Sequence, residues 1–192
     1  MVVRVWRWYE KMMAQHPWKT KIITAGTLCG AGDLVSQFAI EKRNFSRKAT
    51  ADAFIPERTV RFFAIGSFYV APVIHSWFLL LERIRLRTRP RFAPLLRVLT
   101  DQVMFSPLFL MSFLTLLRLL EQQTPRQAVL STRRDFFRIY RRSLMVWPWV
   151  QLLNFYLVPL HFRIVVVQCV ALFWNTFLAY ATHHAAQTII VQ

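Results

Sequence analysis

Residues 62–81 read FFAIGSFYVAPVIHSWFLLL, a run of twenty residues without Asp, Glu, Lys or Arg. A helix rises roughly 1.5 Å per residue, so this length suffices to cross a hydrocarbon layer of about 30 Å. Three further stretches of similar length contain at most one charged residue each, and they cover residues 22–40, 98–117 and 164–181. Four such stretches are too many to bury in the water-soluble core of a 192-residue chain. The sequence therefore predicts an all-α fold, a polytopic membrane helical bundle built as a single domain.

The charged residues lie in clusters between these apolar stretches. The chain is 55% hydrophobic, with a mean hydropathy of +0.32, yet it carries a formal net charge of +16. A charge of this size suggests nucleic acid or anionic lipid as a partner. Because the basic segments flank apolar stretches, we predict anionic membrane lipids and no direct nucleic acid. The basic residues divide almost evenly between the two sides of the membrane, so the positive-inside rule leaves the orientation open.

The basic segment at residues 118–143 is predicted to form a helix on the membrane surface. Aromatic residues lie between its arginines at helical spacing, so one side suits lipid and the other suits phosphates. Five arginines are expected to contact headgroups: Arg133, Arg134, Arg138, Arg141 and Arg142. Residues 1–21 form a shorter basic amphipathic segment, which suits either an interfacial anchor or mitochondrial import.

The first apolar stretch contains a stripe of small and polar residues. Gly26, Gly30, Asp33 and Gln37 are spaced so that they fall within about 60° of one another on a helix. The glycine pair permits close approach of a neighbouring helix, as in small-residue contacts between membrane helices. A carboxylate inside a membrane is costly and often marks a transport pathway. The two readings of Asp33 are a pathway residue and a buried group that holds helices together through amides or an arginine.

The second and third apolar stretches carry one ionisable group each. Asp101 follows Arg97 by four residues, so a local ion pair at the interface is the alternative to a pore-lining role. His75 is either a proton-sensitive pore group or a packing histidine. Pro72 lies three residues before it and removes a helical hydrogen bond, so we expect a bend or a gating point there.

Amides recur near the carboxyl end of the chain. In the stretch WPWVQLLNF, Gln151 and Asn154 share one helical face. Pro148 and a second proline eleven residues later delimit a predicted helix at 144–160, too short to cross upright and therefore tilted, interfacial or re-entrant. Pro148 is a second candidate gating point.

The last apolar stretch repeats this pattern. Gln168 and Asn175 lie seven residues apart and share one face. Because lipid offers no hydrogen-bond partner, we expect the amide stripes to face one another and the stripe that contains Asp33. The same residues would line a pore or serve only as contacts between helices, and the sequence leaves both readings open.

Spaced motifs along nearly the whole chain resemble one known family. They are T-A-G-x-L-x-x-x-G-D-x-x-x-Q at 24–37, R-x-x-R-F at 58–62, P-x-x-H-x-W at 72–77, W-P-x-x-Q-x-x-N-F at 147–155 and W-N at 174–175. This pattern resembles the Mpv-seventeen and peroxisomal membrane protein twenty-two family of small organelle membrane proteins. The resemblance implies about four spans, a place in the mitochondrial inner membrane or the peroxisomal membrane, and links to mitochondrial DNA maintenance and the handling of reactive oxygen. It implies no settled substrate and no catalytic residue.

We therefore predict a non-enzymatic channel or pore for ions or small metabolites, placed in the mitochondrial inner membrane with the peroxisomal membrane as the alternative. A non-conducting protein that organises anionic lipid is the second hypothesis. The sequence contains no recognisable catalytic triad, phosphate loop or metal-binding pair of histidines, so we expect no cofactor and no metal. The glycine stripe would serve packing within one chain or assembly of a homo-oligomer.

Overall fold

The computed structural model describes residues 2–43, 53–83, 92–160, 162–174 and 176. Helices account for nearly all of the described residues, which confirms the all-α fold class. The single bundle predicted from the sequence is divided into two compact units. Unit 1 comprises Met1–Ser76 with Ile164–Gln192, and unit 2 comprises Trp77–Arg163.

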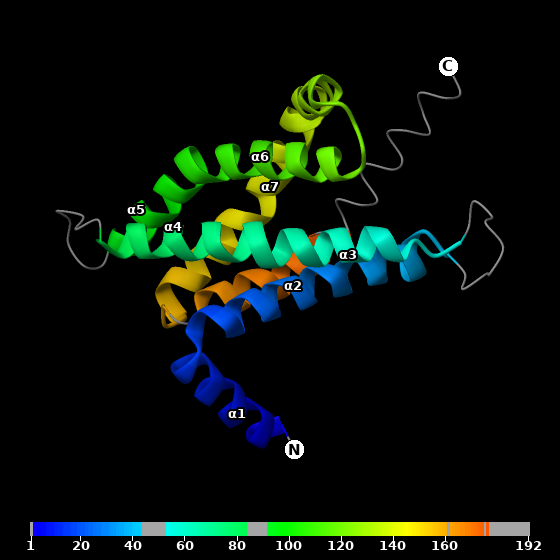
Figure 1. The fold of residues 1–192 in the computed structure, drawn as a ribbon. Coiled ribbons are helices and arrows are strands. Elements are labelled where there is room, and N and C mark those ends of the chain that lie inside the picture. The colour runs from blue at the N-terminus through cyan, green and yellow to red at the C-terminus, as the bar shows by residue number, and fades with distance from the viewer. Residues whose placement is uncertain (1, 44–52, 84–91, 161, 175, 177–192) are drawn as a thin grey trace. The chain divides into compact units, whose positions relative to one another are not determined.

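Unit 1 is built around the pairing of α2 with the helix that follows it. Its elements in chain order are α1 (Val2–Gln15), α2 (Pro17–Val35), η1 (Ser36–Ile40), α3 (Pro56–Ile65), η2 (Gly66–Val70), the first part of α4 (Ala71–Arg83) and the apolar helix Arg163–Trp174. Figure 1 shows α2 and α3 side by side. Pro17 and Pro56 lie in the first turns of α2 and α3, where a missing backbone N–H leaves no hydrogen bond unmade.

Hydrogen bonds made by hydroxyl groups connect α1 to α2. The Thr20 hydroxyl donates to the carbonyl oxygens of Met12 and His16, at 3.0 and 2.9 Å. The Tyr9 and Thr24 hydroxyls are hydrogen-bonded at 3.1 Å. Burial raises the pKa of Tyr9, so this phenol stays neutral at physiological pH. The amphipathic N-terminal segment predicted from the sequence is thus a helix tied to α2.

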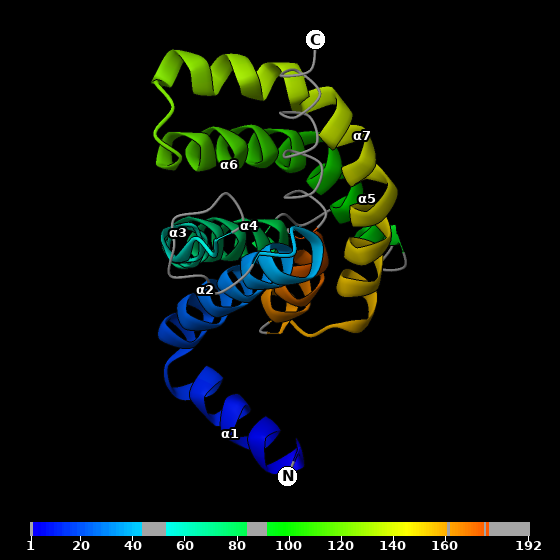
Figure 2. The same cartoon turned by 90° about the vertical axis from the view of Figure 1, so that its right-hand side faces the viewer.

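Unit 2 contains the rest of α4 followed by α5 (Ala93–Thr100), η4 (Asp101–Phe105), α6 (Ser106–Leu120) and α7 (Pro125–Leu157). In Figure 2, α7 changes direction along its length. It contacts both α6 and α5. A capping box starts α7: the Thr124 hydroxyl accepts from the Gln127 backbone N–H, and the Gln127 side chain accepts from the Thr124 backbone N–H.

The prediction of a separate short helix at 144–160 is wrong. α7 runs without a break through Pro148, so the surface helix expected near 118–143 and the short helix are one element of 33 residues. Side-chain bonds to η4 lie on both sides of the proline: Tyr140 donates to the Gln102 carbonyl at 2.9 Å, and Gln151 donates to Asp101 at 3.1 Å. Pro148 removes one backbone hydrogen bond of α7, and these two side-chain bonds stabilise the helix on either side of it.

Three segments have the wider π-helical turn: η1, η2 and η4. η2 ends two residues before Pro72, and η4 ends two residues before Pro107. Proline cannot donate its backbone hydrogen bond, and its ring crowds the carbonyl four residues earlier. A π-helical turn is wider than an α-helical turn and relieves this crowding of the carbonyl, so the helices continue past both prolines. Such turns occur often at functional sites.

Two of the described helices are long and apolar enough to cross a membrane, namely Pro56–Arg83 and Ala93–Leu120. They contain the predicted stretches 62–81 and 98–117. The stretch 22–40 is helical within α2 and η1, and the helix Arg163–Trp174 is apolar but shorter.

Candidate functional site

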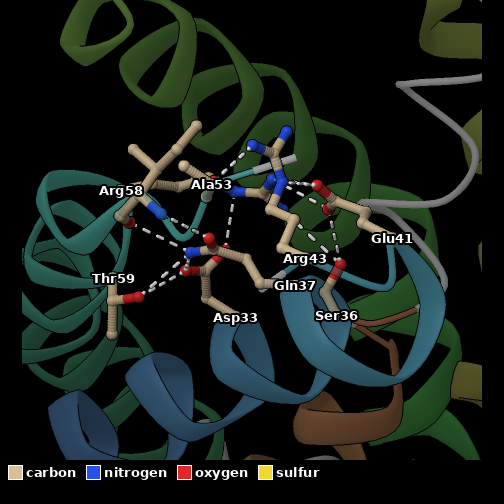
Figure 3. Close-up of polar contacts among 9 residues, drawn as sticks. Asp33, Ser36, Gln37, Glu41, Arg43, Ala53, Arg58 and Thr59 are labelled. Carbon is tan, nitrogen blue, oxygen red and sulfur yellow. Dashed lines mark hydrogen bonds and ion pairs between the residues drawn. The ribbon is translucent and has the colours of Figure 1, made fainter. Parts of the chain in front are cut away.

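Asp33 lies on α2 at the centre of a buried polar cluster in unit 1 (Figure 3). Its Oδ1 pairs with the Arg58 Nε at 2.7 Å. Its Oδ2 accepts hydrogen bonds from Gln37 and from the Thr59 hydroxyl, both at 2.7 Å. Arg58 and Thr59 come from α3, so these contacts join α3 to α2. The predicted stripe of Asp33 and Gln37 therefore faces a neighbouring helix.

Gln37 connects the cluster to the backbone of Ile55, the residue that precedes α3. Its side-chain oxygen accepts from the Ile55 backbone N–H at 2.9 Å, and its side-chain nitrogen donates to the Ile55 carbonyl at 3.1 Å. The side chain has no exposed surface. Both ends of the amide are thus paired with protein, which fixes where α3 begins.

Glu41 completes the charge balance of this cluster. Arg58 donates to both Glu41 carboxylate oxygens, at 2.8 and 3.0 Å. Arg43 donates to Glu41 at 2.7 Å and to the Ala53 carbonyl at 3.0 Å. Two arginines face two carboxylates, so the cluster is formally neutral. An arginine was one of the partners expected for a packing Asp33, but the sequence did not identify which one; the place of Arg58 in the R-x-x-R-F motif was the available signal.

Asp101 lies in η4 and forms a second buried cluster, in unit 2. The Trp77 indole N–H donates to its Oδ1 at 2.7 Å. The amide nitrogens of Gln102 and Gln151 donate to its Oδ2, at 2.7 and 3.1 Å. Asp101 is only 2% exposed. All three donors are neutral, which distinguishes this carboxylate from Asp33.

The expected local ion pair between Arg97 and Asp101 is absent, and that alternative is wrong. Arg97 pairs with Glu82 at 2.9 Å, and Glu82 also pairs with Arg163. Both arginines therefore have a carboxylate partner on α4. Within the described residues, no salt bridge reaches Asp101.

The Asp101 cluster also contains two acceptors without donors. Asn154 donates to the Gln151 oxygen at 3.2 Å and to the Arg163 carbonyl at 3.4 Å. Its own side-chain oxygen and that of Gln102 have no hydrogen-bond partner among the residues that the structure describes. Asn154 is fully buried and Gln102 is 6% exposed. Gln151 and Asn154, which were predicted to share one helical face, are hydrogen-bonded to each other, and Gln151 bonds to Asp101 in place of the expected stripe that contains Asp33.

The other predicted polar residues lie in unit 1. His75 Nδ1 lies 3.1 Å from the Lys21 Nζ, and the ring packs edge-on against Trp18. Gln168 accepts from the Cys29 thiol at 3.8 Å, which joins α2 to the helix Arg163–Trp174. Asn175 lies outside the described residues. The hydrogen bonds described for His75 and Gln168 lead to Lys21 and Cys29 and not to the Asp33 cluster.

Glycines allow the close crossing of α2 with the helix that contains η2. A Cβ at Gly66 would lie 2.8 Å from the Ala25 carbonyl oxygen and 2.8 Å from Cys29. A Cβ at Gly26 would collide with the Ser67 hydroxyl, whereas one at Gly30 would meet atoms only at 3.7 Å or beyond. The packing prediction therefore fits Gly26 and not Gly30. Gly66 received no packing role from the sequence, because its importance depends on which helix crosses it.

A third buried pair joins α6 to α7. Arg118 donates to Asp135 at 2.6 Å and to the Thr132 hydroxyl at 2.9 Å. Arg138 and Arg134, both exposed, approach the same carboxylate at 3.1 and 3.5 Å. Two of the five arginines assigned to headgroups thus also contact the protein.

The outward face of α7 carries the predicted basic surface. All five arginines are exposed, and so is Phe137, at 78%. The aromatic neighbours Phe136 and Tyr140 stack on each other at 5.3 Å. This face, consisting of Arg133, Arg134, Phe137, Arg138, Arg141 and Arg142, is called the α7 basic face below.

The helices and the buried polar clusters define the chain as a helical membrane protein. A profile of the Mpv17 / PMP22 family matches residues 118–179. Proteins named "Mitochondrial inner membrane protein Mpv17" are similar over most of their length: 39% identical in Danio rerio (92% of this chain, 96% of the relative), 37% in Mus musculus (93% and 98%) and 35% in Caenorhabditis elegans (90% and 90%). No solved structure matches. The chain belongs to the Mpv17 / PMP22 family.

Proposed function

We propose that the protein is a multi-pass channel of the mitochondrial inner membrane for ions or small metabolites, with the Asp101 cluster as part of its polar lining. The names of its relatives support the location. The peroxisomal membrane is the alternative location, and imaging a tagged chain against both organelles distinguishes them. A role in mitochondrial homeostasis, implied by the family resemblance, would follow from such a channel.

The observation that carries this proposal is the buried carboxyl group of Asp101, which has no cationic partner among the described side chains. Its helix, within Ala93–Leu120, is one of two that are long and apolar enough to cross a membrane. Ionisable residues within such helices are costly, and they generally mark a pathway or a water-filled cavity. Asp101 has only neutral donors among the described side chains. The bonds from Trp77 and Gln151 join α4 and α7 to η4 at this carboxyl group, but neither donor carries a positive charge.

The Asp33 cluster supports a different assignment. Asp33 Oδ1 forms an ion pair with Arg58, its Oδ2 accepts two hydrogen bonds, and the single side-chain oxygen of Gln37 accepts from the Ile55 backbone N–H. Such a closed network stabilises one arrangement of helices but offers nothing to a passing ion. We therefore assign the helix-packing role to Asp33 and the pathway role to Asp101.

The test compares single-channel currents of the purified protein in planar bilayers with those of two variants. Asp101→Asn removes the charge while keeping the size of the side chain, so we expect a changed ion preference or conductance. Glu57→Gln makes the same chemical change at an exposed residue in the first turn of α3 and should leave the currents unchanged. Currents absent from clean wild-type preparations, or unaffected by Asp101→Asn, would contradict the proposal.

A second candidate function is the organisation of anionic lipid, and the α7 basic face favours it. Its five exposed arginines and Phe137 suit a helix that lies at the headgroups with one ring in the acyl region. Each basic residue near an anionic surface contributes about 1 kcal/mol to binding. The face would act whether or not the protein conducts.

Binding of cardiolipin or phosphatidylglycerol to the purified protein in nanodiscs tests this candidate. Arg133→Gln with Arg141→Gln removes two exposed charges that do not approach Asp135, and should weaken binding of anionic lipid in a salt-dependent manner. Lys19→Gln with Lys42→Gln is a matched control for net charge outside this face. Equal weakening by both pairs would mean that only overall charge matters.

A further inference from the structure

We infer that the Asp101 cluster (Asp101, Gln102, Gln151 and Asn154) binds one alkali cation, such as Na⁺ or K⁺. This inference rests on the proposed role of Asp101 in a pathway and deepens it by naming the bound ion. Binding is measurable without current, so the two proposals fail separately.

The first argument is the charge state of the carboxyl group. Three N–H donors, from Trp77, Gln102 and Gln151, point at the two oxygens of Asp101. Burial of the carboxyl group favours its neutral form, and these hydrogen bonds favour the ionised form, so a cation bound beside it would shift the balance to the carboxylate. An ionised group buried in an apolar helix requires a compensating positive charge. No described side chain supplies one.

The second argument is the unused acceptor capacity of the same cluster. A carboxylate has about four acceptor positions, and three of those on Asp101 are occupied. The side-chain oxygens of Gln102 and Asn154, more than nine-tenths buried, have no donor within the described ranges. The amide of Gln102 directs its nitrogen at Asp101, and that of Asn154 directs its nitrogen at Gln151. Both oxygens therefore belong to side chains of the same hydrogen-bonded cluster as the carboxylate and have no donor of their own.

The chemistry of these atoms selects the ion. Carboxylate and amide oxygens are the ligands that hard cations prefer, and carbonyl oxygens replace the water shell of alkali cations in channels. A single carboxylate balances a single positive charge. Within the described part of the chain, no three His, Cys, Asp or Glu side chains come together as a divalent or transition-metal site would require. A monovalent cation is thus the species that fits both the charge and the acceptors.

The site also explains why three amide side chains gather in one place. If the cluster served only to join helices, paired amides would satisfy one another, as Gln37 does with the Ile55 backbone. Here all three amide nitrogens donate within the cluster or to the Arg163 carbonyl, and two oxygens remain. A cation would be coordinated by these two oxygens and the carboxylate, which gives the cluster a use for its surplus of acceptors.

The test is equilibrium binding of radioactive Na⁺ or Rb⁺ to the full chain, purified in detergent, in a choline buffer of constant ionic strength. We expect saturable binding of one ion per chain. Asp101→Asn should abolish this binding. Gln102→Met keeps the carboxylate but removes one unused oxygen together with one N–H donor to Asp101, and should weaken binding severalfold. Glu57→Gln, exposed and far from the cluster in sequence, should bind as the wild type does.

Several outcomes would overturn the inference. These are a folded wild-type protein without saturable binding, binding that survives Asp101→Asn, or binding that Gln102→Met leaves unchanged. An infrared band of a protonated carboxyl group that disappears in Asp101→Asn but not on addition of Na⁺ would assign a proton to the site instead. Should Asp101→Asn fail to fold, Gln102→Met still decides. Currents without binding contradict only the cation site, and binding without currents contradicts only the channel.

Discussion

Asp33 and Asp101 are the single charged residues of two long apolar stretches, and each is followed by a glutamine within four residues. Their surroundings nevertheless differ. Asp33 pairs with an arginine from the neighbouring helix inside a neutral cluster, whereas the donors to Asp101 among the described residues are an indole and two amides. The residue type and its helical setting therefore do not decide the role of a buried carboxylate. The charge of the side chains that contact the carboxylate decides its role.

The largest expected effect is at the paired cluster. Arg58→Met leaves Asp33 buried without its cation, and removing one partner of a buried pair costs about 3–5 kcal/mol. The free energy of unfolding, measured by titration with sodium dodecyl sulfate in mixed micelles, should fall by this amount. The double variant Asp33→Leu with Arg58→Met removes both charges and should regain part of the loss. A single variant as stable as the wild type would mean that the pair is dispensable.

The crossing of α2 with η2 should show the next largest effect. In Gly66→Ala the added methyl group meets the Ala25 carbonyl oxygen, a backbone atom that cannot move without shifting α2. Forcing an extra carbon into such a contact costs about 1–3 kcal/mol. Gly30→Ala has room for its methyl group and should be neutral or slightly stabilising, because alanine is the better helix former. Equal losses from both variants, in the same unfolding assay, would contradict this packing.

Removing the charge of Asp101 should affect stability less than removing that of Asp33. Asp33→Asn weakens bonds to a charged partner, which contribute about 1.5–3 kcal/mol. Asp101→Asn loses charged acceptors but also relieves an uncompensated buried charge, so we expect a change within about 1 kcal/mol in alkali-free buffer. Thermal unfolding of the two variants beside the wild type measures the difference. A larger loss from Asp101→Asn would reverse the comparison.

The smallest effect is expected for Arg97→Gln. Arg97 is partly exposed and shares Glu82 with Arg163, so its loss should cost at most about 1 kcal/mol. Because it does not pair with Asp101, cation uptake should equal that of the wild type. Altered uptake would show that Arg97 acts on the Asp101 carboxylate.

Much of the fold could be predicted from hydrophobic patterning. The apolar stretches at 62–81 and 98–117 lie in the two longest apolar helices, and Gln37 bonds to Asp33 one turn away, as their spacing predicted. Contacts within one helix depend only on local periodicity, which the sequence contains directly.

Contacts between helices could not be predicted in this way. Arg58 as partner of Asp33, and Gly66 as the point of closest approach, depend on how two helices cross. The continuity of α7 through Pro148 depends on bonds to η4 on both sides of the proline. The local rule that proline ends a helix was overridden by these tertiary contacts.

Water access at the two clusters tests the contrast between them most directly. In a background with Cys29 and Cys169 replaced by alanine, Gln37→Cys and Gln102→Cys each place one thiol at a buried amide. Membrane-embedded protein is then exposed to a water-soluble thiol reagent, and labelling is read by mass. We predict labelling at position 102 and protection at position 37. Protection at 102, or labelling at 37 equal to that at 102, would contradict the division into a closed cluster and an open one.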